Sequence, residues 1–139
     1  MRLEKGFLHW KAELITEFDP FETGLDRFVK LEKGAFIGRE ALMARQAAGP
    51  RKRLVTLEID STDAPAHSGA SLMRAGRVVG TVTSGDRGYR TGLNLAFAFV
   101  APDCAAPGSV LQADLCGEIV AARVITPSPY DPEHSRMRG

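Results

Sequence analysis

Hydrophobic and polar residues alternate with a period of two along residues 53–60. Val55, Leu57 and Ile59 fall on one face, and the residues between and after them are polar. Successive side chains of a β-strand point to opposite faces, so this spacing predicts a strand with one buried face.

Further strands are predicted downstream. Residues 72–83 have the pattern of a hairpin that turns at Ala75-Gly76, and residues 110–125 have the same pattern around Gly117. Residues 93–100 are largely apolar on both faces, which is typical of a strand buried on both sides. About six short strands with turn residues between them favour a small closed or nearly closed β-barrel, so the chain is expected to be mostly β.

The pattern changes near residue 50. Residues 37–48 are rich in strong helix formers, and Gly49-Pro50 is a stop signal because proline cannot continue the helical hydrogen bonds. Ile37, Ala41 and Leu42 contribute to a modest apolar face. We therefore expect two parts, residues 1–49 with a helix at about 37–48 and residues 50–139 with the barrel.

The first 34 residues are harder to interpret. Residues 11–15 fit either a helix or a strand, and Asp19-Pro20 ends any helix there, because the residue before proline is pushed out of the α region. Aromatic residues are unusually dense for a loop, with Phe18, Phe21 and Phe28 among them. This segment is expected to pack against something.

Composition narrows the class of protein. Eighteen basic and 17 acidic residues in a chain of 139 give a net charge of +1, which argues against a dedicated nucleic-acid binder. Cys104 and Cys116 are too few for a disulfide scaffold. No signal peptide and no apolar stretch near the roughly 20 residues of a membrane span are visible, so a cytoplasmic protein without membrane contact is expected.

Candidate chemistry is sparse when residues are considered alone. The three histidines are spread along the chain without ligand spacing, so no metal site is predicted. Glu4 and Glu22 could form a paired acid/base site, but structural ion pairing or capping is the favoured interpretation.

The loop at residues 84–92 contains three glycines together with Arg87 and Arg90. Glycine allows backbone N–H groups to approach an anion, and arginine can complete such a site. A polar connection between two barrel strands is the favoured alternative.

Several short motifs, in order, resemble the folate-binding T-protein family, which includes glycine cleavage aminomethyltransferase and the C-terminal halves of dimethylglycine and sarcosine dehydrogenases. They are Arg2-Leu3-Glu4-Lys5-Gly6, Asp19-Pro20-Phe21-Glu22-Thr23-Gly24-Leu25, Phe36-Ile37-Gly38-Arg39-Glu40-Ala41-Leu42, Gly80-Thr81-Val82-Thr83-Ser84-Gly85, Leu95-Ala96-Phe97-Ala98-Phe99-Val100, Ala106-Pro107-Gly108 and Pro129-Tyr130-Asp131-Pro132. The resemblance implies a six-stranded antiparallel C-terminal barrel preceded by a short α/loop remnant of the folate-binding domain.

The resemblance also implies a function and a cofactor. The complete protein would transfer a one-carbon unit from an amine to tetrahydrofolate, with Arg2 contacting the folate and Tyr130 lying in the segment that approaches it. The family's catalytic aspartate lies in a front half that this chain lacks, so no catalytic residue is assigned and the chain alone is expected to be inactive.

Two functions remain open. The chain is either the C-terminal portion of such an enzyme or a non-catalytic barrel that binds a partner chain or a small anion through the Arg87/Arg90 loop. Under the second hypothesis, the partner chain would supply the front half. The uncovered aromatic residues of the first 34 positions also predict a homodimer, and the alternative is a monomer in which this segment folds back on the chain's own barrel.

Overall fold

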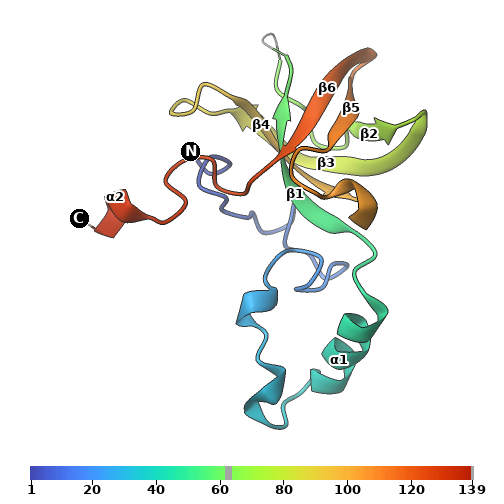
Figure 1. The fold of residues 1–139 in the computed structure, drawn as a ribbon, viewed down its shortest axis with the longest axis vertical. Coiled ribbons are helices and arrows are strands. Elements are labelled where there is room, and N and C mark those ends of the chain that lie inside the picture. The colour runs from blue at the N-terminus through green and yellow to red at the C-terminus, as the bar shows by residue number, and fades with distance from the viewer. Residues whose placement is uncertain (62–63, 139) are drawn as a thin grey trace.

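The computed structural model describes residues 1–61 and 64–138, and β-strands make up most of its regular structure. The strands are β1 (Arg53–Ile59), β2 (Ser71–Arg74), β3 (Arg77–Arg87), β4 (Asn94–Val100), β5 (Val110–Leu115) and β6 (Glu118–Ile125). They form a closed barrel in the order β1-β4-β3-β2-β5-β6, and every pairing is antiparallel. Figure 1 shows this barrel, and the expected mostly β fold is confirmed.

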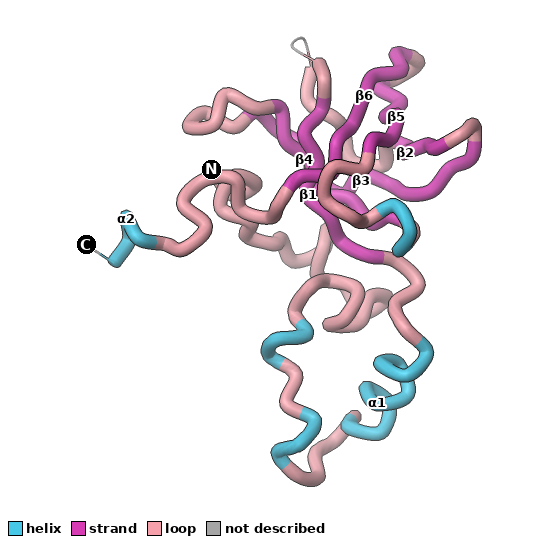
Figure 2. Tube along the Cα trace, in the orientation of Figure 1, coloured by secondary structure: helices cyan, strands magenta, loops and turns pink. Residues whose placement is uncertain are grey.

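The helices are short and lie outside the barrel, as Figure 2 shows. They are the 3-10 helices η1 (Asp26–Phe28), η2 (Leu31–Lys33) and η3 (Pro102–Cys104) and the α-helices α1 (Arg39–Ala48) and α2 (Ser135–Arg138). Helix α1 occupies the expected position, but none of its residues is buried. Ile37 precedes the helix and is fully exposed, so the predicted apolar face covers no core.

The barrel interior is filled by alternating large and small side chains. Leu57, Leu72 and Leu111 are among the large residues of this core, and Ala98 and Ala113 are among the small ones. A small closed barrel has room for only such a mixture, because side chains from all strands converge on one axis. The predicted inner face of residues 53–60 is part of this core.

The outer face of β4 is also buried, and residues from the N-terminal segment cover it. Leu3 packs with Leu95 and Phe97, and Leu8 packs against the same cluster. Phe18 stacks on Phe99 with ring centroids 3.7 Å apart. Both faces of β4 are therefore apolar for different reasons: one faces the barrel core and the other faces residues 1–25.

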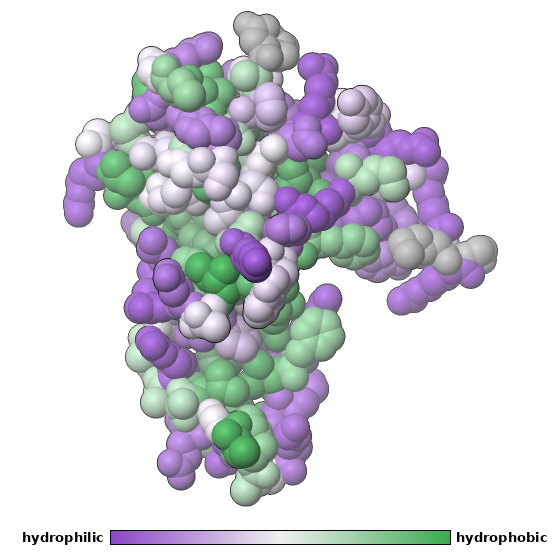
Figure 3. Space-filling view, turned by 180° about the vertical axis from the view of Figure 1, so that it is seen from behind, coloured by the Kyte–Doolittle hydropathy of each residue, from purple (hydrophilic) through white to green (hydrophobic). Residues whose placement is uncertain are grey.

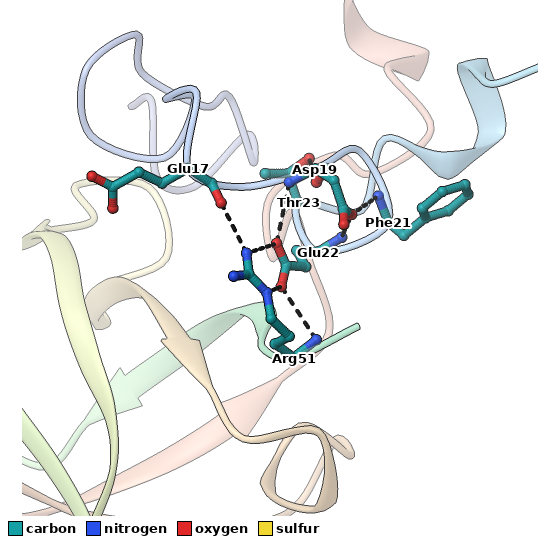
Figure 4. Close-up of polar contacts among 6 residues, drawn as sticks. All are labelled: Glu17, Asp19, Phe21, Glu22, Thr23 and Arg51. Carbon is teal, nitrogen blue, oxygen red and sulfur yellow. Dashed lines mark hydrogen bonds and ion pairs between the residues drawn. The ribbon is translucent and has the colours of Figure 1, made fainter. Parts of the chain in front are cut away.

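An ion pair joins residues 1–25 to the start of the barrel, as Figure 4 shows. The Arg51 side chain donates to both carboxylate oxygens of Glu22, at 3.1 and 3.2 Å, and the Leu54 N–H donates to the Glu22 carbonyl at 2.8 Å. The Glu22 side chain is buried, whereas that of Arg51 is largely exposed. Residues 26–48 extend away from the barrel between these two anchored points (Figure 1).

Two expectations from the sequence need correction. Residues 11–13 form a turn rather than a helix or a strand, since the N–H groups of residues 12–14 all donate to the His9 carbonyl, and Leu14 forms only an isolated bridge with Trp10. Strand β3 continues to Arg87, so residues 84–87 of the predicted loop at 84–92 belong to a strand. Tertiary pairing explains the longer strand. Residues 84–87 pair with residues 94–97 of β4, and this pairing supplies hydrogen-bond partners for their backbone groups, which the polar side-chain pattern did not indicate.

Candidate functional site

Arg2 lies on an N-terminal turn that is closed by backbone hydrogen bonds, including one from the Phe7 N–H to the Arg2 carbonyl at 3.1 Å. Its guanidinium carbon is 5.5 Å from the centre of the Phe97 ring, which places the cation against an aromatic face. One guanidinium nitrogen, Nη1, donates to the Phe7 carbonyl and to the Glu13 carboxylate, each at 3.1 Å. The side chain remains 35% exposed, so part of the guanidinium faces solvent.

Glu13 is the centre of this arrangement, and its side chain is completely buried. Oxygen Oε2 accepts from Arg2 and from the His9 N–H at 2.7 Å. Oxygen Oε1 accepts from the Thr83 hydroxyl at 2.7 Å and from the Ser84 hydroxyl. A buried carboxylate is tolerated only when it is paired and hydrogen-bonded, and these four donors meet that requirement.

The four donors also decide the charge of Glu13. Burial by itself raises the pKa of this carboxyl, but the hydrogen bonds from Ser84, Thr83 and His9 and the charge of Arg2 outweigh burial and hold the pKa below its ordinary value. Glu13 is therefore ionised at neutral pH and keeps the Arg2 guanidinium in one orientation over Phe97.

Glu4 holds the loop that follows β3. Its oxygen Oε1 accepts from the N–H groups of Arg90 and Thr91, at 2.7 and 2.9 Å, and the N-terminal ammonium lies 3.4 Å from Oε2. A β-carbon on Gly88 would lie 2.8 Å from Oε1, so only glycine permits this approach. Burial acts to raise the pKa of Glu4, and these hydrogen bonds lower it below its ordinary value.

The Glu4 contacts revise the expected role of the loop at 84–92. Its backbone N–H groups do bind an anion, but that anion is the chain's own Glu4 carboxylate. Glu4 and Glu22 have separate partners and form structural interactions, as the favoured sequence interpretation held. The second hypothesis, a small-anion site at the Arg87/Arg90 loop, therefore loses two of the donors it relied on.

Tyr130 lies beside the same N-terminal turn. Its N–H donates to the Glu4 carbonyl at 3.0 Å, and the Lys5 ammonium lies 5.9 Å from its ring centre. Lys5 also forms a 3.0 Å ion pair with Asp131, and both side chains are buried. The hydrogen bond from Lys5 lowers the pKa of Asp131 to about 2.

The two predicted folate-binding residues thus both lie at the N-terminal turn but have different neighbours. Arg2 contacts Glu13 and Phe97, whereas Tyr130 is held at Glu4 and Lys5. Sequence reasoning missed Glu13 entirely. The only signal was a single carboxylate between Ala12 and Leu14, and the hydroxyls that need it as an acceptor lie 70 and 71 positions away.

The chemistry available here is recognition rather than bond breaking. A fixed, partly exposed guanidinium can donate to a carboxylate or a ring carbonyl, and the tyrosine ring offers an aromatic surface.

Across residues 1–61 and 64–138, no cluster of three or more potential metal ligands is found. No helix in that part of the chain is both long and apolar enough to cross a membrane.

Comparisons with known proteins agree on one family. The profile of the "Glycine cleavage T-protein C-terminal barrel domain" matches residues 52–131. Dimethylglycine dehydrogenase of Rattus norvegicus, a mitochondrial protein by its name, is 35% identical over 139 residues, which span 99% of this chain and 16% of the relative. An aminomethyltransferase of Moorella thermoacetica is 38% identical over 125 residues, covering 90% of this chain and 34% of the relative.

A solved structure has the same fold. The glycine cleavage system aminomethyltransferase T from Bartonella henselae superposes with a TM-score of 0.88 at 26% identity, covering 94% of this chain and 37% of that protein. The chain therefore spans only a minor part of the relatives it matches. The matched profile, the identities and the closed six-stranded barrel together show that this chain belongs to the glycine cleavage T-protein C-terminal barrel family.

Proposed function

We propose that this chain is the C-terminal portion of a tetrahydrofolate-dependent aminomethyltransferase or dimethylglycine dehydrogenase-type protein. In that role it forms one wall of the folate site of a protein that transfers a one-carbon unit from an amine. The single observation that supports this best is the Arg2 guanidinium, which buried Glu13 orients over Phe97 while part of it faces solvent.

The residues present suit a folate. Tetrahydrofolate carries a carbonyl-bearing pterin and glutamate carboxylates, and when bound it is the acceptor of the one-carbon unit. Arg2 would donate to one of those oxygens, and Tyr130 would present its ring or hydroxyl to the ligand. Neither residue moves a proton or attacks a substrate, so their role is to bind and orient.

A chimaera tests this proposal. Residues 2–131 of this chain would replace the matching segment of the Moorella thermoacetica aminomethyltransferase, and the tetrahydrofolate dependence of its activity would be measured. Arg2→Gln should raise the KM for tetrahydrofolate about tenfold, since a hydrogen bond to a charged group is lost. Arg123→Gln, on an exposed position of β6, is the matched control. An unchanged KM in the folded Arg2 variant would refute the assignment.

We further propose that a folate-binding front portion, on the same or a separate polypeptide, covers the outer surface of residues 7–37. Phe7, Trp10 and Phe28 are 50%, 65% and 68% exposed there. Figure 3 shows hydrophobic side chains interleaved with hydrophilic ones over the lower part of the molecule, where Figure 1 places residues 26–48. The homodimer predicted from the sequence is the alternative occupant, and light scattering of the pure chain at micromolar concentration distinguishes a dimer from a 15.0 kDa monomer. A cytoplasmic location stays a prediction.

A further inference from the structure

A pocket lies on the barrel wall, and neither Arg2 nor Tyr130 is part of its lining. Its volume is about 550 Å³, and it is formed between the chain segment that leads into β1 and the β2–β3 hairpin. Four cationic residues line it: Arg51 and Lys52 from the first segment, and Arg74 and Arg77 from the hairpin. Asp103 is the only acidic residue in its lining.

Two of the four cationic side chains are bound by neighbouring groups, which hold them in place in the pocket lining. The Arg51 side chain is bound by Glu22, as described above. Arg74 Nη1 lies 3.3 Å from the Asp103 carbonyl, 3.5 Å from the Cys104 sulfur and 3.7 Å from the Asp103 carboxylate. The charges of Arg51 and Arg74 are therefore largely balanced before any ligand arrives.

The other two cations are available. Within the described part of the chain, no carboxylate lies within ion-pair distance of Lys52 or Arg77. Both residues are exposed, and they come from the two different chain segments that line the pocket. Two uncompensated positive charges in the lining of one concave surface favour a ligand with at least two negative groups.

The rest of the lining limits the size and character of that ligand. Val78, Val79 and Ala101 form an apolar surface between the cations, and Thr81 adds a hydroxyl. Small-molecule sites commonly combine an apolar lining with a few placed polar groups. We infer that this pocket binds a small organic anion that carries two or more carboxylate or phosphate groups. The site is independent of the proposed folate contact at Arg2.

The test is a titration of the isotopically labelled chain, followed through its backbone amide NMR signals. Citrate and inorganic pyrophosphate are added separately at low ionic strength, and their relative affinities tell whether carboxylate or phosphate is preferred. Saturable shifts are expected at residues 51–52 and 74–81 and should weaken in about 0.5 M salt, where screening is strong. The double substitution Lys52→Gln/Arg77→Gln should weaken binding about tenfold.

Arg87→Gln/Arg90→Gln is the matched control, because it removes the same charge from the loop first considered as an anion site. This control should change the affinity less than about twofold. The inference is overturned if neither probe gives saturable shifts, if the shifts centre on residues 84–92, or if both double variants lose the same affinity. Should the Lys52/Arg77 double variant not fold, each single substitution is expected to weaken binding about threefold, and unchanged affinity in both also overturns it.

Discussion

Glu13 offers the sharpest test of the structure, because one buried carboxylate connects Arg2, His9, Thr83 and Ser84. Replacing it with alanine removes one acceptor from each of four donors, of which Arg2 keeps the Phe7 carbonyl and Thr83 keeps the Phe97 carbonyl. An unsatisfied buried partner costs about 1–3 kcal/mol, and the rotatable hydroxyls of Thr83 and Ser84 recover part of that loss. The Arg2 side chain is 35% exposed, so solvent screening reduces the energetic cost of losing its ion pair with Glu13. We expect Glu13→Ala to lower the free energy of unfolding by about 3–5 kcal/mol.

Glutamine at the same position separates charge from shape. The amide carbonyl that Glu13→Gln introduces can still accept from Arg2 and His9, while the amide nitrogen faces the hydroxyls of Thr83 and Ser84, which are able to accept as well as donate. Only the charge-assisted part of each bond is lost, so Glu13→Gln should cost about 1–2 kcal/mol. Denaturant unfolding followed by circular dichroism measures both values.

The pH dependence follows from the lowered pKa of Glu13. The stabilisation is fully present above the unfolded-state pKa, near the ordinary value, and is lost as pH falls through the lower folded-state pKa. The stability difference between the wild type and Glu13→Gln should therefore shrink below about pH 4.5. Glu17→Gln, an exposed position in the same segment, is the control and should have almost no effect. The reasoning is refuted if Glu13→Gln and Glu13→Ala both match this control at neutral pH.

Three further predictions concern other parts of the chain. Asparagine tolerates the positive φ of 48° at position 131, so Asp131→Asn should keep the local backbone. In the wild type, the lowered pKa of Asp131 means that its ion pair with Lys5 stabilises the fold and is lost on acidification, so Asp131→Asn should flatten the pH dependence of stability between about pH 4 and pH 2. Acid unfolding curves measure this, and an unaltered curve contradicts it. Cys116→Asn should raise the free energy of unfolding by about 0.5–1 kcal/mol, because asparagine adopts the observed φ of 57° more readily; a lower denaturation midpoint would count against it. Trypsin should cut within residues 26–48 before residues 1–25, which pack on the barrel, and mass spectrometry of early fragments decides the order.

The proteolysis prediction differs from the one that the sequence supports. Because the sequence predicts a barrel that begins at residue 50, it also predicts that a protease trims the N-terminal region before the barrel. The structure anchors residues 1–25 through Leu3, Phe18 and the buried carboxylates, whereas none of residues 26–48 is buried. The division at residue 49/50 remains a prediction about domains, whereas local stability is expected to change near residue 26.

Local sequence patterns were sufficient to place the barrel strands and their turns. The alternation at Val55, Leu57 and Ile59 placed β1, and Ala75-Gly76 and Gly117 placed two hairpins, because period-two patterning and turn residues act over a few neighbouring positions. The same local signals located helix α1 and the apolar faces of β4. The short motifs also identified the family, since they depend only on residue order.

Only the folded chain shows which polar groups meet. Glu13 binds hydroxyls 70 and 71 positions away, Glu4 binds the loop at Arg90 and Thr91, and Lys5 pairs with Asp131 across 126 positions. No local pattern identifies such partners, because the residues around a carboxylate on a turn do not show whether it will face water or a buried donor. Burial makes the difference: once the barrel and the N-terminal segment exclude water, each charge must find a partner within the fold.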